Sequence, residues 1–159
     1  MPTDTKPQSD VAIACDAHAL AAEQHKRWME SIGPQLYGAV QEIRELPDGY
    51  AFRLPNNPEI LLLVAEDLNM ERLCCPFVRY TLEVEPNRGP FWLHFTGGEG
   101  VKEFLRMSFE SSNLLAEQVA GAAGFSVAAR TDLDSVETVL ETIDRLNERF
   151  ARTVASSHG

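Results

Sequence analysis

Four stretches of the chain alternate apolar and polar residues with the two-residue period of a β-strand. Residues 40–46 and 50–54 form the first pair, joined by the turn Pro47-Asp48-Gly49. Residues 78–84 and 91–95 form the second pair, joined by another segment that contains Pro and Gly. Each pair predicts a β-hairpin, because Pro sets φ and Gly accepts a positive φ in a tight turn.

A helix is expected between the two hairpins, from Pro58 to about Leu73 or Cys74. Asn57 is a favourable cap, Pro58 suits the first helical position, and Pro76 disfavours helical geometry at the residue before it. Apolar residues recur there at spacings of three and four, which predicts one shared face. The residues on that face are Leu61, Val64, Ala65, Leu68, Arg72 and Cys75.

Two further helices are expected on either side of these elements. The first begins near Asp16 or Leu20 and runs to Ser31, and Gly33-Pro34 is expected to break it because Pro lacks a backbone donor. The second follows the second hairpin, with Val101 and Phe104 on its apolar face. The resulting order β-β-α-β-β-α predicts an α+β fold with a four-stranded, mostly antiparallel sheet, an N-terminal helix and a C-terminal helical extension.

The chain divides into three segments on this pattern. Residues 1–14 are expected to be a flexible lead, residues 15–110 an α+β domain, and residues 111–159 a helical extension. Apolar residues in the extension recur at spacings of three and four over almost three heptads. This seam predicts either a homodimer contact or packing on the chain's own domain, and it consists of Val136, Val139, Ile143, Leu146, Phe150 and Thr153.

Charge and hydropathy exclude several partners. The net charge is −10, with 24 acidic and 14 basic residues and no basic run, which disfavours nucleic acid and anionic membranes as partners. No apolar stretch approaches the length of about 20 residues that a membrane span needs. Without a signal-peptide pattern at the N-terminus, the expected location is the cytoplasm, where three cysteines would normally remain thiols and a disulfide framework is not expected.

The adjacent pair Cys74-Cys75 carries the strongest chemical signal in the chain. Two neighbouring thiols at the end of a helix could bind a thiophilic ion if the chain turns both side chains inward, and Cys15 could supply a third sulfur. Sulfur ligands favour soft ions, so the candidates are Zn, Hg, As, Cd and Cu. The alternative is that all three cysteines are small apolar residues packed in the core.

Four other residues could support such a site. Glu71 lies four residues before Cys75 and could be a ligand or a proton acceptor, although an exposed helix acid is the simpler interpretation. The C-terminal end of a helix disfavours a thiolate, and nearby Arg72 and Arg79 could offset that effect. His94 is a candidate ligand or a surface imidazole.

Several segments resemble a family of small uncharacterised bacterial proteins built around a Glu-Arg-x-Cys-Cys-Pro-Phe motif. The resemblance covers roughly residues 14 to 106, and its segments are Glu42–Pro55, Glu71–Phe77, Leu82–Pro86, Leu93–Gly97 and Glu99–Leu105. Similar Cys-Cys-Pro-Phe segments resemble parts of proteins associated with heavy-metal resistance. The resemblance implies a site at Glu71, Cys74, Cys75 and Cys15, and it implies no enzymatic activity.

Three functions are consistent with these observations. The first is binding or sensing of a soft metal or metalloid ion by the cysteines. The second is a cysteine-dependent redox enzyme in which one thiol reacts and its neighbour resolves the intermediate. The third is a dimeric scaffold or small-ligand domain with packed cysteines. The sequence leaves the choice between binding and catalysis open.

Overall fold

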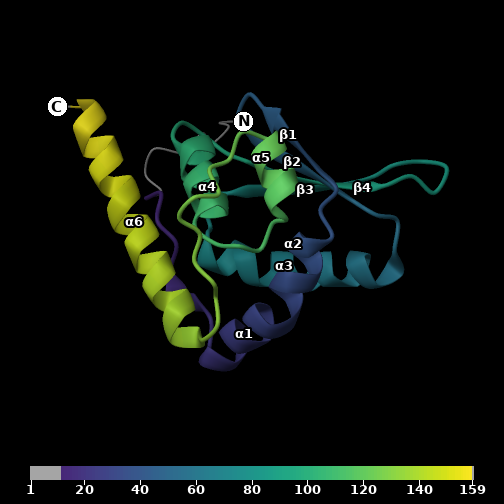
Figure 1. Cartoon of the computed structure of the whole chain (residues 1–159), viewed down its shortest axis with the longest axis horizontal. Helices are drawn as coiled ribbons and strands as arrows, with labels where there is room; N and C mark the ends of the chain where they lie inside the picture. The colour runs from purple at the N-terminus through teal and green to yellow at the C-terminus, as the bar shows by residue number, and fades with distance from the viewer. Residues whose placement is uncertain (1–11, 159) are drawn as a thin grey trace, which may run out of the picture.

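A computed structural model describes residues 12–158, whose strands form one four-stranded sheet. In Figure 1 helices lie to the left of this sheet and below it. The strands are β1 (Glu42–Leu46), β2 (Gly49–Leu54), β3 (Arg79–Val84) and β4 (Phe91–Thr96). They are ordered β1-β2-β4-β3 and every neighbouring pair is antiparallel. The predicted α+β fold with two hairpins is therefore confirmed, and β2 and β4 join the hairpins into one sheet.

One face of the sheet carries the hydrophobic core. Phe52, Leu93 and Phe95 are almost fully buried on this face, and the rings of Phe52 and Phe95 lie 5.1 Å apart in an edge-to-face arrangement. Arg53 and Trp92 are paired on the other face, where the guanidinium of Arg44 lies 4.2 Å from the centre of the Trp92 ring. Side chains alternate between the two faces along each strand, and the second face is also partly covered, since Trp92 and Ala51 on it are buried.

The helix between the hairpins, α3 (Pro58–Cys74), begins as predicted, but it buries a different face. The Asn57 side chain accepts hydrogen bonds from the backbone of Glu59 and Ile60, at 2.8 and 3.3 Å. The predicted face shares only Val64 with the residues that the helix buries, because the six consecutive apolar residues from Ile60 to Ala65 give no helical phase. The buried residues are Ile60, Leu63, Val64, Asp67, Met70 and Cys74, whereas Leu61, Ala65 and Arg72 are exposed.

The N-terminal helical region continues through the expected break at Gly33-Pro34. It comprises η2 (Ala17–Ala19), α1 (Ala22–Arg27), the π-helical turn η3 (Trp28–Ile32) and α2 (Gly33–Gly38). The amide of Gly33 bonds to the carbonyl of Trp28, five residues earlier, and Pro34 then occupies the first turn of α2. The wider π turn displaces the carbonyl that the proline ring would meet in a regular α-helix, so the chain passes Pro34 without ending the helix.

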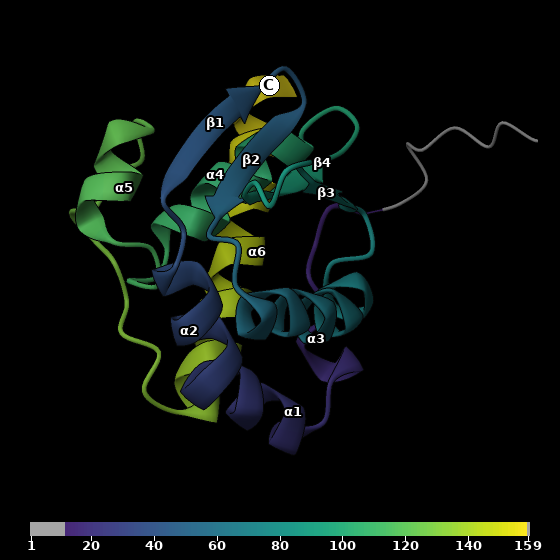
Figure 2. The ribbon, with the colours of Figure 1, turned by 90° about the vertical axis from the view of Figure 1, so that its right-hand side faces the viewer.

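Three more helices complete the fold: α4 (Val101–Glu110), α5 (Glu117–Ala122) and α6 (Val136–His158). Seen in Figure 2, α4 and α6 lie behind β1 and β2, and α3 crosses below them. Leu146 and Phe150 of α6 are buried against Phe104 and Met107 of α4. This part of the seam therefore packs on the chain's own fold, which is the second of its two predicted uses, and self-association stays a prediction.

The expected flexible lead falls mainly outside the described residues, which start at position 12. Ile13, near the end of that lead, packs against the same cluster as Phe104 and Phe150. Within residues 12–158, no helix combines the length and apolarity that crossing a bilayer requires.

Candidate thiol site

The three cysteines meet at the C-terminal end of α3. Cys74 is the last residue of the helix, and Cys75 is its cap, with φ −123° and ψ 73°. This change of backbone direction before Pro76 lets two adjacent side chains face the same region. The N-terminal segment crosses the helix end there, and the amide of Asp16 donates to the carbonyl of Cys74 at 2.7 Å.

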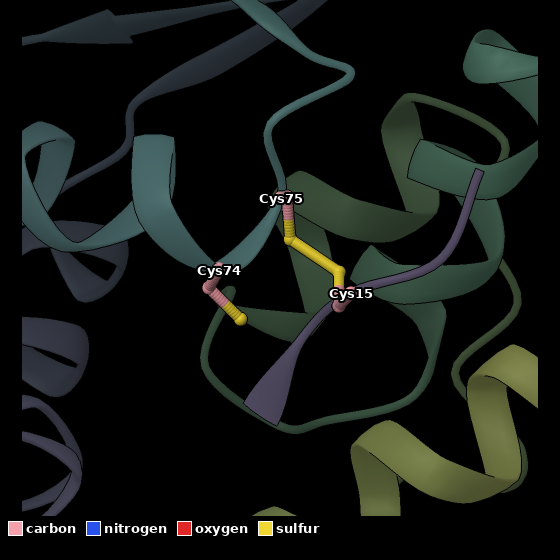
Figure 3. Close-up of side chains that lie close together, drawn as sticks. All are labelled: Cys15, Cys74 and Cys75. Atoms are coloured by element: carbon pink, nitrogen blue, oxygen red, sulfur yellow. A yellow bond between two sulfur atoms is a disulfide. The ribbon is translucent and has the colours of Figure 1, made fainter. Parts of the chain in front are cut away.

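Cys15 and Cys75 form a disulfide, with their Cα atoms 4.6 Å apart (Figure 3). Cys74 remains a free thiol that is 8% exposed. All three sulfur atoms lie within 4.8 Å of one another. The expectation of three separate thiols is therefore wrong for this state, because folding brings together two cysteines whose sequence separation of 60 carries no sign of pairing.

Asn147 of α6 holds the segment that carries Cys15. The amide of Cys15 donates to Oδ1 of Asn147 at 2.9 Å, and Nδ2 of Asn147 donates to the carbonyl of Cys15, also at 2.9 Å. The side-chain amide thus satisfies both backbone groups of Cys15. Nothing in the sequence pattern marks Asn147, which follows the buried Leu146 on an otherwise ordinary amphipathic helix.

A cavity of about 150 Å³ lies beside the sulfur atoms. All three cysteines line it, and most of its other lining side chains are aromatic or aliphatic, including Trp28, Leu105 and Phe109. Glu71 is the one carboxylic acid among the described residues that line it, and no Lys or Arg of that part of the chain does so. The site therefore joins sulfur ligands to a mostly apolar chamber, and its one basic lining side chain within residues 12–158 is the buried His25, whose Nε2 atom lies 2.6 Å from the carbonyl of Ala17.

Two neighbouring acids, the buried Asp67 and the half-buried Glu71, lie beside this chamber. The hydroxyl of Tyr37 lies 3.0 Å from Oδ2 of Asp67 and 3.2 Å from Oε2 of Glu71, and Nε1 of Trp28 donates to Oδ1 of Asp67 at 2.7 Å. Burial raises the pKa of Asp67 to about 6 and raises the pKa of Glu71 well above its usual value. A hydroxyl has one hydrogen, so a protonated Glu71 can donate to Tyr37 while Tyr37 donates to Asp67.

Burial also determines the protonation state of the free thiol, Cys74. It raises the pKa of Cys74 to about 12, with smaller contributions from the neighbouring carboxyl groups of Glu71 and Asp16. At neutral pH Cys74 is therefore a thiol and a poor nucleophile, since the thiolate is the reactive form. A bound cation would reverse this preference, because a metal ion stabilises the deprotonated sulfur that binds it.

The other predicted site residues lie in different places. Glu71 lines the cavity, but the ligand cluster within residues 12–158 contains the three cysteines without it. Arg72 is exposed and donates to the side chain of Asn69 at 2.8 Å. Arg79 is also exposed, and the half-buried His94 lies across from Ala51 and Thr81, on the sheet face opposite the core. Neither arginine nor His94 lines the thiol cavity.

Sequence reasoning missed the residues that surround the sulfurs. Tyr37, Asp67 and Trp28 make the buried hydrogen-bond network, and Tyr80 donates from its hydroxyl to the carbonyl of Glu71 at 3.3 Å. The one available signal was Asp67, an acid between apolar positions of α3. An acidic side chain at such a position is usually exposed. The burial of Asp67 could therefore be recognised only once its hydrogen-bond partners were known.

Comparisons with protein families, with curated proteins and with solved structures found no match for this chain. Membership of the family with the Cys-Cys-Pro-Phe motif thus stays a prediction. The residues that carry this resemblance do lie together in the fold, because Glu71, Cys74, Cys75 and Cys15 all line one cavity.

Proposed function

We propose that the reduced protein binds one soft metal or metalloid ion through Cys15, Cys74 and Cys75. The observation that carries the proposal is the grouping of three sulfur atoms within 4.8 Å of one another. An ion with metal–sulfur bonds of about 2.3 Å holds its sulfur ligands about 4 Å apart. Small side-chain rotations would bring the three sulfurs to that spacing once the disulfide is open.

The charge of the complex narrows the choice of ion. Three thiolates around a divalent ion leave a net negative charge, and a buried charge is costly without a partner. No Lys or Arg of the described chain lines the cavity to balance it, and the Nε2 atom of its one lining histidine, His25, is engaged with the carbonyl of Ala17 at 2.6 Å. A trivalent ion such as As(III) is neutral on three thiolates, and Hg(II) is neutral on two, so these ions suit the chamber better than Zn(II) or Cd(II).

The disulfide makes ion binding depend on redox state. When Cys15 and Cys75 are bridged, Cys74 is the sole thiol left and cannot chelate an ion alone. Opening the bridge takes two electrons from a thiol or phosphine reductant and two protons, which come from that thiol or, with a phosphine, from water as the phosphine oxide forms. The two new thiols complete the ligand set. The protein would thus bind the ion under reducing conditions and lose the ability to bind it when the disulfide forms.

The alternative function, a cysteine-dependent redox enzyme, is less well supported. Such an enzyme needs an accessible thiol with a lowered pKa, whereas Cys74 is buried and its pKa is raised to about 12. The third alternative, a scaffold with packed cysteines, predicts that the reduced protein binds no ion. Ion binding therefore separates the first proposal from the third.

Native mass spectrometry tests the proposal directly. The phosphine-reduced protein is mixed with one equivalent of As(III), Hg(II) or Zn(II), and we expect one As(III) or Hg(II) ion per chain. Cys15→Ser, Cys74→Ser and Cys75→Ser should each lose As(III), and the oxidised protein should bind neither ion. His94→Ala is the matched control, since His94 lies on the opposite sheet face.

Absence of any bound ion on the reduced wild-type protein would overturn the proposal. Retention of As(III) by all three serine variants would also overturn it, because the ion would then lie elsewhere. The same spectra give the mass of the assembly, and a dimer mass would support the predicted self-association.

A further inference from the structure

The cavity beside the cysteines is larger than a bare ion requires. Its volume is about 150 Å³, and Leu105, Ser108 and Ile143 line it together with the three cysteines. An ion bound directly to three sulfurs occupies the space between them and leaves the rest of the chamber unused. An engineered protein cavity of about this volume with an apolar lining binds benzene.

The lining favours an apolar group of aromatic size. Phe109 and Trp28 contribute ring surfaces, and Leu105 and Ile143 contribute aliphatic ones. The half-buried Ser108 of α4 also lines the cavity, and a larger side chain at this position would reduce the cavity volume. The chamber thus combines thiols at one side with space for a ring beside them.

We propose that the site accepts a monoaryl compound of trivalent arsenic, with two cysteine sulfurs bound to arsenic and the aryl ring in the cavity. This inference rests on the proposed function, because it uses the same reduced thiols. It goes further by assigning the cavity to the organic group of the ligand. The ligand class is then an organometalloid in place of a bare ion.

The chemistry is a ligand exchange that needs no oxidant or reductant. An aryl arsenic dihydroxide reacts with two thiols, two arsenic–oxygen bonds break, and two arsenic–sulfur bonds form. The two thiol protons leave in two molecules of water, and arsenic remains trivalent throughout. The product is electrically neutral, which fits a chamber that no Lys or Arg of the described residues lines.

A comparison of phenyl and methyl ligands isolates the contribution of the cavity. Both compounds use two thiolates, so they differ only in the organic group. Burial of a phenyl ring in place of a methyl group favours binding on the order of tenfold. We would titrate phosphine-reduced protein with phenylarsenic(III) oxide and methylarsenic(III) oxide, each in competition with dithiothreitol, a dithiol without a cavity.

Two variants test the location of the ring. Ser108→Phe fills the cavity, and we expect it to abolish the tenfold preference for phenyl while methyl affinity stays within about twofold. Ser156→Phe makes the same change at an exposed position of α6 and should retain the preference. If Ser108→Phe fails to fold, the ratio of phenyl to methyl affinity in the wild-type protein still tests whether the ring lies in the cavity.

Each result separates the two proposals. If the protein binds the phenyl and methyl compounds with equal affinity relative to dithiothreitol, the ring does not occupy the cavity. This result would overturn the cavity assignment and leave thiol binding intact. A preference that survives Ser108→Phe in a folded protein would also overturn it. Failure of both compounds to bind the reduced protein would instead overturn the proposed function.

Discussion

The bridge between Cys15 and Cys75 ties the N-terminal segment to the end of α3, so opening it should lower stability by a calculable amount. The two residues are separated by 60 positions in the sequence. Closing a loop of that length in the unfolded chain removes conformational entropy worth about 4 kcal/mol at 25 °C in the chain-entropy treatment. The reduced protein and Cys15→Ala should both lose stability of this size.

Urea unfolding, followed by the fluorescence of Trp28 and Trp92, measures the effect. A slope of about 2 kcal/mol per molar urea is typical for a chain of this size, so the expected shift of the midpoint is about 2 M. Cys15→Ala should unfold at the same urea concentration with or without reductant. Cys74→Ala is the control, because it removes a buried thiol but leaves the bridge, and it should keep the full shift on reduction.

Two outcomes would refute this reasoning. If oxidised and reduced wild-type protein unfold at the same midpoint, the bridge does not constrain the unfolded chain. If Cys74→Ala loses the redox-dependent shift and Cys15→Ala keeps it, the stabilising bridge involves Cys74 and the pairing of Cys15 with Cys75 is wrong.

Three further predictions follow from the buried groups. In the folded, oxidised protein the buried Cys74 should resist alkylation by iodoacetamide. Mass spectrometry should find one alkylated thiol after unfolding and three after unfolding with reduction. Rapid labelling of Cys74 in the folded protein would contradict its burial. Hg(II) affinity, measured by competition, should rise about tenfold per pH unit for each thiol proton released, whereas As(III) hydroxide affinity should stay flat because its hydroxyl groups take up those protons. Burial raises the pKa of Asp67 from 3.8 to about 6, so its contribution to stability is full below pH 3.8 and is lost as pH rises through 6, a change of about 3 kcal/mol. Asp67→Asn should flatten the fall in urea midpoint between pH 4 and pH 7, and an unchanged slope would show that another group titrates.

Local patterns determined much of the fold. The two-residue alternation in 50–54 and 91–95 was sufficient to identify both strands and their inward faces, because side chains of a strand point alternately to opposite sides. Asn57 and Pro58 were sufficient to locate the start of α3, since capping involves neighbouring residues alone. The phase of α3 was not available locally, because residues 61–64 are all apolar and any of several faces could be buried.

The sequence by itself also determined where the chemistry lies, since Cys74-Cys75 is the distinctive thiol pair of the chain. Only the tertiary structure decided what surrounds it. Cys15 reaches the pair because Asn147, 132 positions away, binds its backbone, and Asp67 is buried because Trp28 and Tyr37, 39 and 30 positions away, supply hydrogen bonds. A cavity likewise exists only between packed elements. Such contacts depend on which distant side chains meet in the folded protein, and the spacing of residues along one segment does not predict those meetings.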